Sequence, residues 1–177
     1  MSKIDTLVVN LVGGPCSGKS TIAAELFSRL KKMGIKCELV PEYIKERIYE
    51  ENNTLIYNQI ALFGMEAYSI DNKIGKVDVI IHDGSLLNNI VYDRTNDKFF
   101  HEFVRHRYTK YNNIDFFINR GTIKFEEYGR IHSLDESKKI DKLIKRIYEE
   151  SNAKLIEVES RDATDKIIPI LLQKLKI

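Results

Sequence analysis

The feature that most constrains this chain is a glycine-rich segment near its N-terminus, residues 13–21, which reads GGPCSGKST. It matches the pattern G-x-x-x-x-G-K-[ST], in which glycines let the backbone wrap closely around a polyphosphate. The apolar run at residues 7–12 precedes it and predicts a buried strand. A helix is predicted after it, with one apolar face formed by Ile22, Leu26, Leu30 and Met33. A strand, a glycine loop and a helix in this order direct loop N–H groups and a helix N-terminus at an anion.

We refer to residues 13–21 as the P-loop and expect it to bind a nucleoside triphosphate. Lys19 is expected to reach the β- and γ-phosphates, and the hydroxyl of Ser20 is expected to ligate Mg²⁺. ATP and Mg²⁺ are therefore the predicted cofactors. The predicted ATP-binding residues are Gly13, Gly14, Pro15, Cys16, Ser17, Gly18, Lys19, Ser20 and Thr21.

The rest of the chain alternates apolar runs with amphipathic segments. Further strands are predicted at residues 35–40, 77–82, 114–119 and 154–158. Further helices are predicted at residues 43–51, 54–74 (capped by Thr54), 86–92, 99–111, 134–151 and 162–175. Apolar strands separated by helices are typical of a parallel sheet that is covered on both faces. With 177 residues, the chain is expected to form a single α/β domain.

Composition and charge limit the binding partners and the cellular compartment that we expect for this chain. The net charge of +2 is too small to argue by itself for a nucleic-acid or membrane partner. The two cysteines, Cys16 and Cys37, have no disulfide or metal spacing, which suits a reducing cytosol. No apolar run is long enough to span a bilayer, and the first apolar stretch runs directly into the P-loop. We therefore expect a cytoplasmic protein without a signal peptide or a membrane partner.

Two acidic residues follow strands, at the end of a parallel sheet where ligands bind. Glu42 follows the second strand and could act as a general base toward an acceptor hydroxyl. The alternative is an ordinary glutamate at the start of a helix, where the helix dipole favours an acidic side chain. Asp83 follows the third strand and could hold Mg²⁺ through water or accept a proton, with an ordinary Asp-Gly turn as the alternative. His82, just before it, is predicted to be a buried histidine that is hydrogen-bonded in the core.

Two arginines, Arg120 and Arg130, fall in residues 120–133, a segment without a clear period. Guanidinium groups on a closing flap would neutralise the charge of a phosphoryl-transfer transition state, and closure would exclude water. Solvated surface arginines are the alternative. The predicted catalytic residues are thus Lys19, Glu42, Asp83, Arg120 and Arg130, and the predicted metal ligands are Ser20 and Asp83.

The P-loop, Glu42, the Asp83-Gly84-Ser85 turn and the two arginines together resemble the P-loop kinases of the nucleoside and nucleotide kinase superfamily. Within that group the chain is most similar to small, often phage-encoded proteins with the same GGPCSGKST loop and a Val-Pro-Glu-Tyr segment, which are described as nucleotide kinase-like or as ATPases. The resemblance covers nearly the whole chain. It implies a three-layer P-loop NTPase fold with a five-stranded parallel sheet in the order 2-3-1-4-5 and a lid at about residues 120–133.

The resemblance also implies Mg-ATP as the phosphate donor and a hydroxyl or phosphate as the acceptor. The chain departs from the pattern at residues 83–85, which read Asp-Gly-Ser, because many nucleoside kinases have an acid-Arg-Ser sequence there. An expected arginine is therefore absent. The identity of the acceptor and the oligomeric state stay open, with a dimer as one candidate.

Three functions are compatible with these features. The first is transfer of the γ-phosphate of ATP to a nucleoside, nucleotide or related small molecule; a monophosphate acceptor would need extra cations, for which Lys45, Arg47 and Arg94 are candidates. The second is a polynucleotide kinase acting on hydroxymethylated DNA, which would need a basic groove built from residues 105–110 and 138–146. The third is a regulatory NTPase without an acceptor. The near-neutral charge weighs against the second.

Overall fold

A parallel sheet of five strands forms the centre of the protein, in the order β2-β3-β1-β4-β5. The structure is a computed structural model and describes residues 5–51, 53–121 and 133–177. The predicted fold class and strand order are confirmed. The strands are β1 (Leu7–Val12), β2 (Cys37–Val40), β3 (Val79–His82), β4 (Asn112–Asn119) and β5 (Leu155–Glu159).

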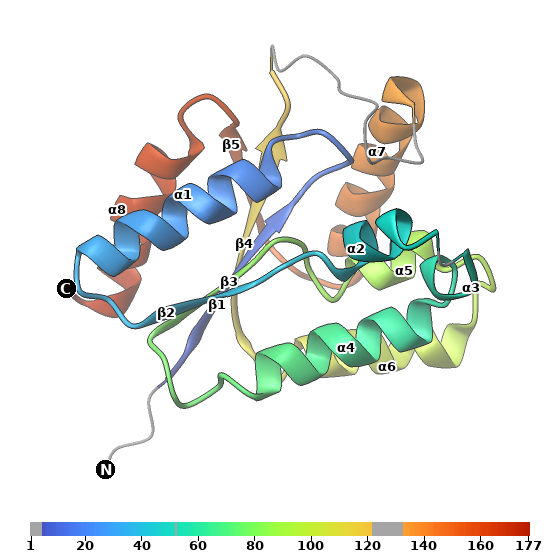
Figure 1. Ribbon diagram of the computed structural model, residues 1–177, viewed down its shortest axis with the longest axis horizontal. Coiled ribbons are helices and arrows are strands. Elements are labelled where there is room, and N and C mark those ends of the chain that lie inside the picture. Colours follow the sequence, from blue (N-terminus) through green and yellow to red (C-terminus); the bar gives the residue numbers. More distant parts are fainter. Residues whose placement is uncertain (1–4, 52, 122–132) are drawn as a thin grey trace.

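Helices cover both faces of the sheet (Figure 1). One face carries α1 (Lys19–Lys32) and α8 (Ala163–Leu175), and the opposite face carries α4 (Gln59–Asp71), α5 (Asn88–Tyr92), α6 (Lys98–Tyr108) and α7 (Leu134–Glu150). Two short helices, α2 (Tyr43–Tyr49) and α3 (Asn53–Ile56), connect β2 to α4. Because successive side chains of a strand point to opposite faces, β1 supplies both cores and is buried along its whole length.

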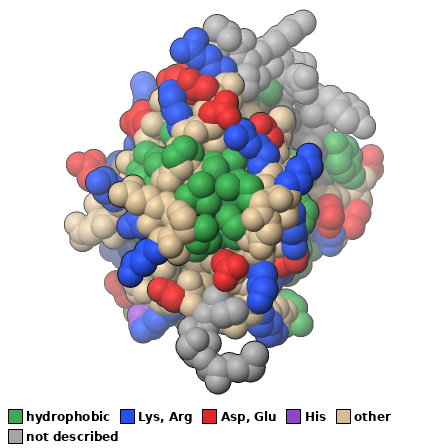
Figure 2. Space-filling model, turned by 90° about the vertical axis from the view of Figure 1, so that its left-hand side faces the viewer, with side chains coloured by type: hydrophobic (Ala, Val, Ile, Leu, Met, Phe, Trp, Pro, Cys, Tyr) green, Lys and Arg blue, Asp and Glu red, His purple; other side chains and the backbone are tan. Residues whose placement is uncertain are grey.

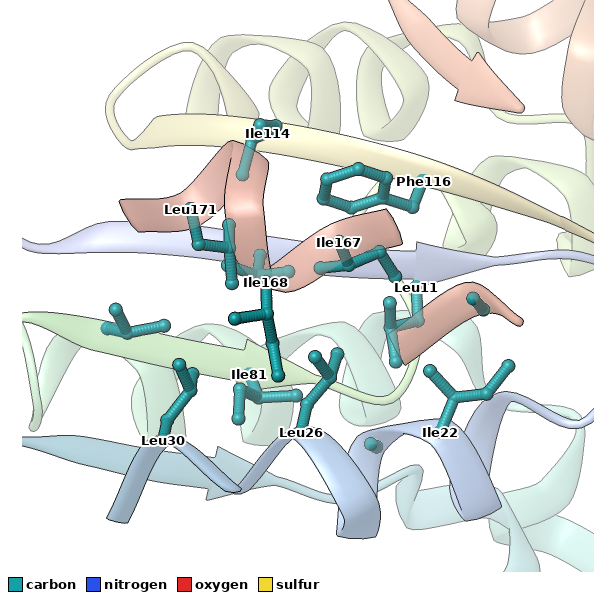
Figure 3. Packing of buried hydrophobic residues seen from close by; sticks show 14 of the residues in the cluster. Leu11, Ile22, Leu26, Leu30, Ile81, Ile114, Phe116, Ile167, Ile168 and Leu171 are labelled. Carbon is teal, nitrogen blue, oxygen red and sulfur yellow. The ribbon is translucent and has the colours of Figure 1, made fainter. Parts of the chain in front are cut away.

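The core between α1, α8 and the sheet is built from aliphatic side chains together with Phe116 and Cys37 (Figure 3). Leu26 and Leu30 of α1 are fully buried there, and Ile22 is 4% exposed, as the apolar face predicts. The prediction was wrong for Met33, which is 49% exposed. The helix ends at Lys32, and the backbone N–H of Met33 caps it by bonding to carbonyls of the preceding turn. Figure 2 shows hydrophobic side chains gathered on the side of the molecule where α1 and α8 end, with charged side chains around them.

The helix predicted over residues 54–74 is two helices in the structure, α3 and α4. The side chain of Asn58 accepts a hydrogen bond from the backbone N–H of Ala61 at 3.1 Å and so caps α4. The prediction of a Thr54 cap for one continuous helix was therefore wrong. Strand β4 begins at Asn112 rather than at residue 114, because its ladder with β1 starts at the pair Leu7 and Asn112.

A polar network lies inside the sheet and its covering helices. Asp115 of β4 is 3% exposed and accepts hydrogen bonds from Asn10 of β1 at 2.9 Å, Tyr108 of α6 at 2.5 Å and Tyr148 of α7 at 2.8 Å. Burial raises the pKa of the Asp115 carboxyl to about 6, although these three hydrogen bonds oppose the shift. The Tyr148 hydroxyl also lies 2.7 Å from Ser85 Oγ, so the network reaches the turn after β3.

His82 of β3 closes the network on its other side. Its side chain is fully buried, and its Nδ1 lies 3.2 Å from Asn10 Oδ1. Burial lowers the pKa of the imidazole to about 3, so the ring is neutral and its Nδ1–H donates to the amide oxygen. The prediction of a buried, hydrogen-bonded core histidine is confirmed.

The neutral state of His82 gives stability a pH dependence. In the unfolded chain the imidazole takes up a proton below its ordinary pKa of about 6.5, whereas the folded protein excludes that proton until pH about 3. Relative to His82→Asn, the wild type should therefore lose about 1.4 kcal/mol of unfolding free energy per pH unit as the pH falls below 6.5 toward 3. Urea unfolding at pH 7.5, 6 and 5 measures this. Asp115 shifts stability in the opposite direction between about pH 4 and 6 and does so in both proteins, so parallel curves would contradict the prediction.

Candidate nucleotide-binding site

The register of the sheet brings the predicted site segments to one edge. In the sheet register, Asn10 of β1 pairs with His82 of β3, and His82 pairs with Val40 of β2. Val12, the last residue of β1, is level with Phe117 of β4. The chain therefore leaves all four strands at the same edge, with the P-loop after β1, Glu42 after β2, Asp83 after β3 and Arg120 after β4.

The P-loop has backbone angles that only its sequence pattern tolerates well. Gly13 and Gly18 have φ of 150° and 93°, and Cys16 has φ of 62°. A Cβ on Gly13 would lie 3.1 Å from the backbone oxygen of Ile118 in β4. The Lys19 side chain, 7% exposed, crosses the loop and donates to the backbone oxygens of Gly13 at 2.8 Å and Gly14 at 3.2 Å. The ammonium group thus lies within the curve of the loop.

The N-terminus of α1 is open to an anion. Gly18 is its N-cap and provides no side-chain hydrogen bond, and the first turn contains no acidic residue. The N–H groups of that turn and the positive end of the helix dipole are therefore available to phosphate oxygens. Ser20 and Thr21 are exposed in this turn. Ser17 Oγ is buried and, within the described residues, has no hydrogen-bond partner.

Asp83 places a buried carboxylate beside this loop. Its side chain is 6% exposed, its backbone N–H donates to Val40 O at 2.9 Å, and its Oδ1 has no partner among the described residues. A buried carboxylate oxygen without a partner suits a cation, a water or a substrate hydroxyl. No group of three or more His, Cys, Asp or Glu side chains in the described parts of the chain could hold a metal. The predicted roles of Ser20 and Asp83 as Mg²⁺ ligands stay predictions; Mg²⁺ at such a site takes its other ligands from phosphate and water.

Arg120 lies against the P-loop and is no surface residue. Its Nε donates to Cys16 O at 3.3 Å and its Nη2 donates to Pro15 O at 3.2 Å. The guanidinium also pairs with Asp141 of α7 at 3.2 Å, and the side chain is 11% exposed. The predicted role of Arg120 at the transferred phosphoryl group stays a prediction. Arg130 lies outside the described residues.

Glu42 precedes α2 and lies near two groups that the sequence did not predict. Its charge raises the pKa of Glu66 in α4 and of Tyr92 in α5, although burial is the main cause of both shifts. The pKa of Glu66 rises to about 8. Its carboxyl accepts a hydrogen bond at 2.8 Å from Asn89, which is 3% exposed. Glu66 could have been found from its position in the sequence, because it lies three residues after Phe63, a buried residue of α4, and therefore on the same side of the helix.

Two of the three cations proposed for a monophosphate acceptor have other partners. Arg47 pairs with Glu46 at 3.0 Å and with Glu50 at 3.1 Å. The Arg94 guanidinium stacks on the ring of Tyr57, 3.6 Å from its centroid. The side chain of Lys45 lies outside the described residues. The described cations near α2 and α5 are thus already neutralised or stacked.

Substituting Gly14 tests how closely the P-loop packs. A Cβ at this position would lie 2.5 Å from the backbone oxygen of Ser137 in α7, which cannot move without the helix. We expect Gly14→Ala to displace the loop and weaken ATP binding by about tenfold or more, as overpacking of a rigid contact does. Calorimetric titration with Mg-ATP measures this. The control is Gly64→Ala on α4, where a Cβ meets nothing within 4 Å. Wild-type affinity in Gly14→Ala would contradict the prediction.

Comparisons with known proteins agree with this geometry. A family model described as an AAA domain matches residues 8–166. The solved structure of a deoxyadenosine kinase from M. mycoides, with the products dCMP and a flexible dCDP bound, matches with a TM-score of 0.55 and 19% identity. That match covers 97% of this chain and 98% of the kinase. No curated protein matches the sequence.

In the parts of the chain that the structure describes, no helix is both long and apolar enough to cross a membrane. The family match spans most of the sequence, and the sheet order and the P-loop are those that the resemblance to P-loop kinases implies. The chain therefore belongs to the AAA domain family and has the fold of a P-loop nucleoside kinase-like protein.

Proposed function

We propose that the protein is a kinase that transfers the γ-phosphate of Mg-ATP to the hydroxyl of a nucleoside or a related small molecule. The observation that carries this proposal is the convergence at one sheet edge of the P-loop, of Asp83, whose buried Oδ1 has no partner among the described residues, and of a second carboxylate at Glu42.

Each of these residues has a defined part in the transfer. Lys19 and the N–H groups at the start of α1 bind the β- and γ-phosphates, and Ser20 and Asp83 hold Mg²⁺, which neutralises phosphate charge when it is bound. Glu42 accepts the proton of the acceptor hydroxyl, whose oxygen forms a bond to the γ-phosphorus while the bond to the ADP oxygen breaks. Arg130 is proposed to neutralise the charge of the transferred group, whereas the described contacts of Arg120 are to Pro15 O, Cys16 O and Asp141 on the α7 side of the loop.

Several of the residues proposed for a DNA groove are engaged in contacts within the protein, which supports a small acceptor. Arg105 donates to Ser151 at 3.2 Å and Glu150 at 3.4 Å, and Arg107 pairs with Asp71 at 2.7 Å. Three of the five basic residues on α7, Lys138, Lys145 and Arg146, pair with acidic side chains, for example Lys145 with Glu157 at 2.7 Å. A phosphate backbone would have to displace each acidic partner before it could bind.

The charges near Glu42 favour an uncharged acceptor over a nucleoside monophosphate. Glu42 and Glu66 are close enough for the charge of one to raise the pKa of the other. The described cations of this region, Arg47 and Arg94, are paired or stacked. An acceptor phosphate would be repelled by the Glu42 carboxylate, and Arg47 and Arg94 would have to leave their present partners to bind it.

The test is transfer of labelled γ-phosphate from Mg-ATP to a panel of acceptors. The panel contains nucleosides, nucleoside monophosphates, nicotinamide riboside, and plain and hydroxymethylated DNA, with Lys19→Ala as the inactive control. Label on a nucleoside-class hydroxyl supports the proposal and names the substrate. Label on DNA, or release of free phosphate that no acceptor changes, overturns it in favour of a polynucleotide kinase or an NTPase.

A further inference from the structure

Helix α7 makes direct contacts with the outer part of the P-loop. Asp141 Oδ1 accepts a hydrogen bond from the backbone N–H of Gly14 at 2.6 Å, and the Ser137 hydroxyl donates to Pro15 O at 2.7 Å. Arg120 joins the two, because its Nη2 donates to Ser137 Oγ at 2.5 Å and to Asp141 Oδ2 at 3.2 Å. These three side chains, which we call the α7 clamp, hold one side of the loop.

The α7 clamp determines which way the P-loop peptide groups face. In a trans peptide the C=O of one residue and the N–H of the next point in opposite directions, and the described chain contains no cis bond. Arg120 and Ser137 of the clamp donate hydrogen bonds to the carbonyls of Pro15 and Cys16. The N–H groups in the same two peptide groups, those of Cys16 and Ser17, therefore point away from α7. Asp141 of the clamp accepts a hydrogen bond from the N–H of Gly14. The carbonyl of Gly13, in the same peptide group, therefore points away from α7 and accepts a hydrogen bond from Lys19.

The result is a loop with two chemically different sides. The side that faces away from α7 presents the Lys19 ammonium and the N–H groups of Cys16 and Ser17, which are the donors that a phosphate needs. The clamp side uses a carboxylate to accept the N–H of Gly14, which points the wrong way for a phosphate. The negative charge of Asp141 is balanced by Arg120, so it does not repel an anion in the loop.

The clamp is held on a rigid support. Ser137 is fully buried, and its backbone oxygen packs so closely on Gly14 that no side chain fits there. A capping box of Ser133 and Glu136 orders the first turn of α7. Farther along the helix, Tyr148 bonds to Asp115 in the sheet. The clamp residues therefore cannot follow the loop if it relaxes.

We propose that Asp141 and Ser137, together with Arg120, are positioning residues that preorganise the P-loop for phosphate, with Asp141 as the principal one. This inference rests on the proposed function only in requiring that the P-loop binds ATP. Asp141 acts through the peptide of Gly14 and does not contact the nucleotide. Nothing in the sequence motif of the P-loop specifies it, because Asp141 is 127 positions away from Gly14.

The test measures ATP affinity by calorimetric titration, which does not depend on phosphate transfer. Asp141→Ala removes the acceptor of the Gly14 N–H and should raise the Kd for Mg-ATP by about tenfold. Asp141→Asn keeps an oxygen acceptor and should stay within about threefold of wild type. Ser137→Ala should weaken binding by an intermediate factor. The matched control is Asp135→Ala on the same helix, whose side chain is 89% exposed.

Two outcomes would overturn the inference. One is wild-type ATP affinity in both Asp141→Ala and Ser137→Ala. The other is equal loss of affinity in Asp141→Ala and Asp141→Asn, which would assign the effect to charge rather than to the Gly14 hydrogen bond. If Asp141→Ala does not fold, Ser137→Ala and Asp141→Asn still decide the question. A wild-type protein that binds ATP but labels no acceptor would overturn the proposed kinase and leave these affinities interpretable.

Discussion

Replacing Lys19 with alanine is expected to lower phosphate transfer by about 10³-fold or more while the protein stays folded. The Lys19 ammonium lies within the P-loop, 2.8 Å from Gly13 O, where it would face the β- and γ-phosphates. Its charge is needed most in the transition state, when negative charge spreads over the transferred oxygens. The fold should persist because α1 is held by buried residues such as Leu26 and Leu30, which the substitution does not touch.

The measurement is transfer of labelled phosphate under saturating acceptor, with circular dichroism and thermal unfolding as checks of folding. Lys32→Ala is the matched control, because Lys32 is exposed at the other end of the same helix. It should retain full activity. Undiminished transfer in a folded Lys19→Ala protein would remove the P-loop from the reaction.

Replacing Glu42 with glutamine is expected to lower kcat by about 10²- to 10⁴-fold, with little change in ATP affinity. The amide keeps the size of the carboxylate but cannot accept the acceptor proton at neutral pH. Glu42 follows β2, whereas the P-loop follows β1, and β3 lies between these two strands in the sheet, so the nucleotide contacts should survive. The neighbouring carboxyl of Glu66 would not replace it, because its pKa of about 8 leaves it largely protonated at pH 7.

Steady-state kinetics with both substrates and calorimetric titration with Mg-ATP separate the two effects. Glu46→Gln on α2 is the control, since this glutamate is exposed and pairs with Arg47. A kcat in Glu42→Gln equal to that of the wild type would exclude Glu42 as the base. A parallel loss of ATP affinity would instead place Glu42 in the nucleotide contacts.

The P-loop and the strands could be predicted because their signals are local, whereas the sheet order was implied by the resemblance to P-loop kinases. A largely apolar run such as residues 7–12 indicates a central strand whatever its neighbours are, and the motif that follows it predicts where a phosphate binds. The residue after each strand could then be placed at one edge by topology alone. Glu42 and Asp83 were singled out in this way, and the structure places them at that edge.

The partners of these residues could not be predicted, because they depend on how helices pack across long sequence separations. The Arg120 contact with the P-loop joins residues 104 and 105 positions apart, and the Glu66 contact with Asn89 depends on how α4 meets α5. The strand sequences did indicate that buried polar contacts exist. Asn10 and Asp115 are polar residues in the middle of apolar runs, and a buried polar side chain implies a partner without naming it. The break at Asn58 was missed because a helical pattern continues across it.

The buried network around Asp115 has a consequence for how this protein can change over time. Removing one member alone leaves the others with unsatisfied buried groups, which costs about 1–3 kcal/mol for each group, whereas replacing all members together by apolar residues of similar shape can be nearly neutral. Asn10, Asp115 and Tyr148 come from three separate parts of the chain, so no short stretch of substitutions reaches them all. Their identities should therefore vary together or not at all among descendants of this sequence, and a designer who wants an apolar interior has to exchange the whole set in one step.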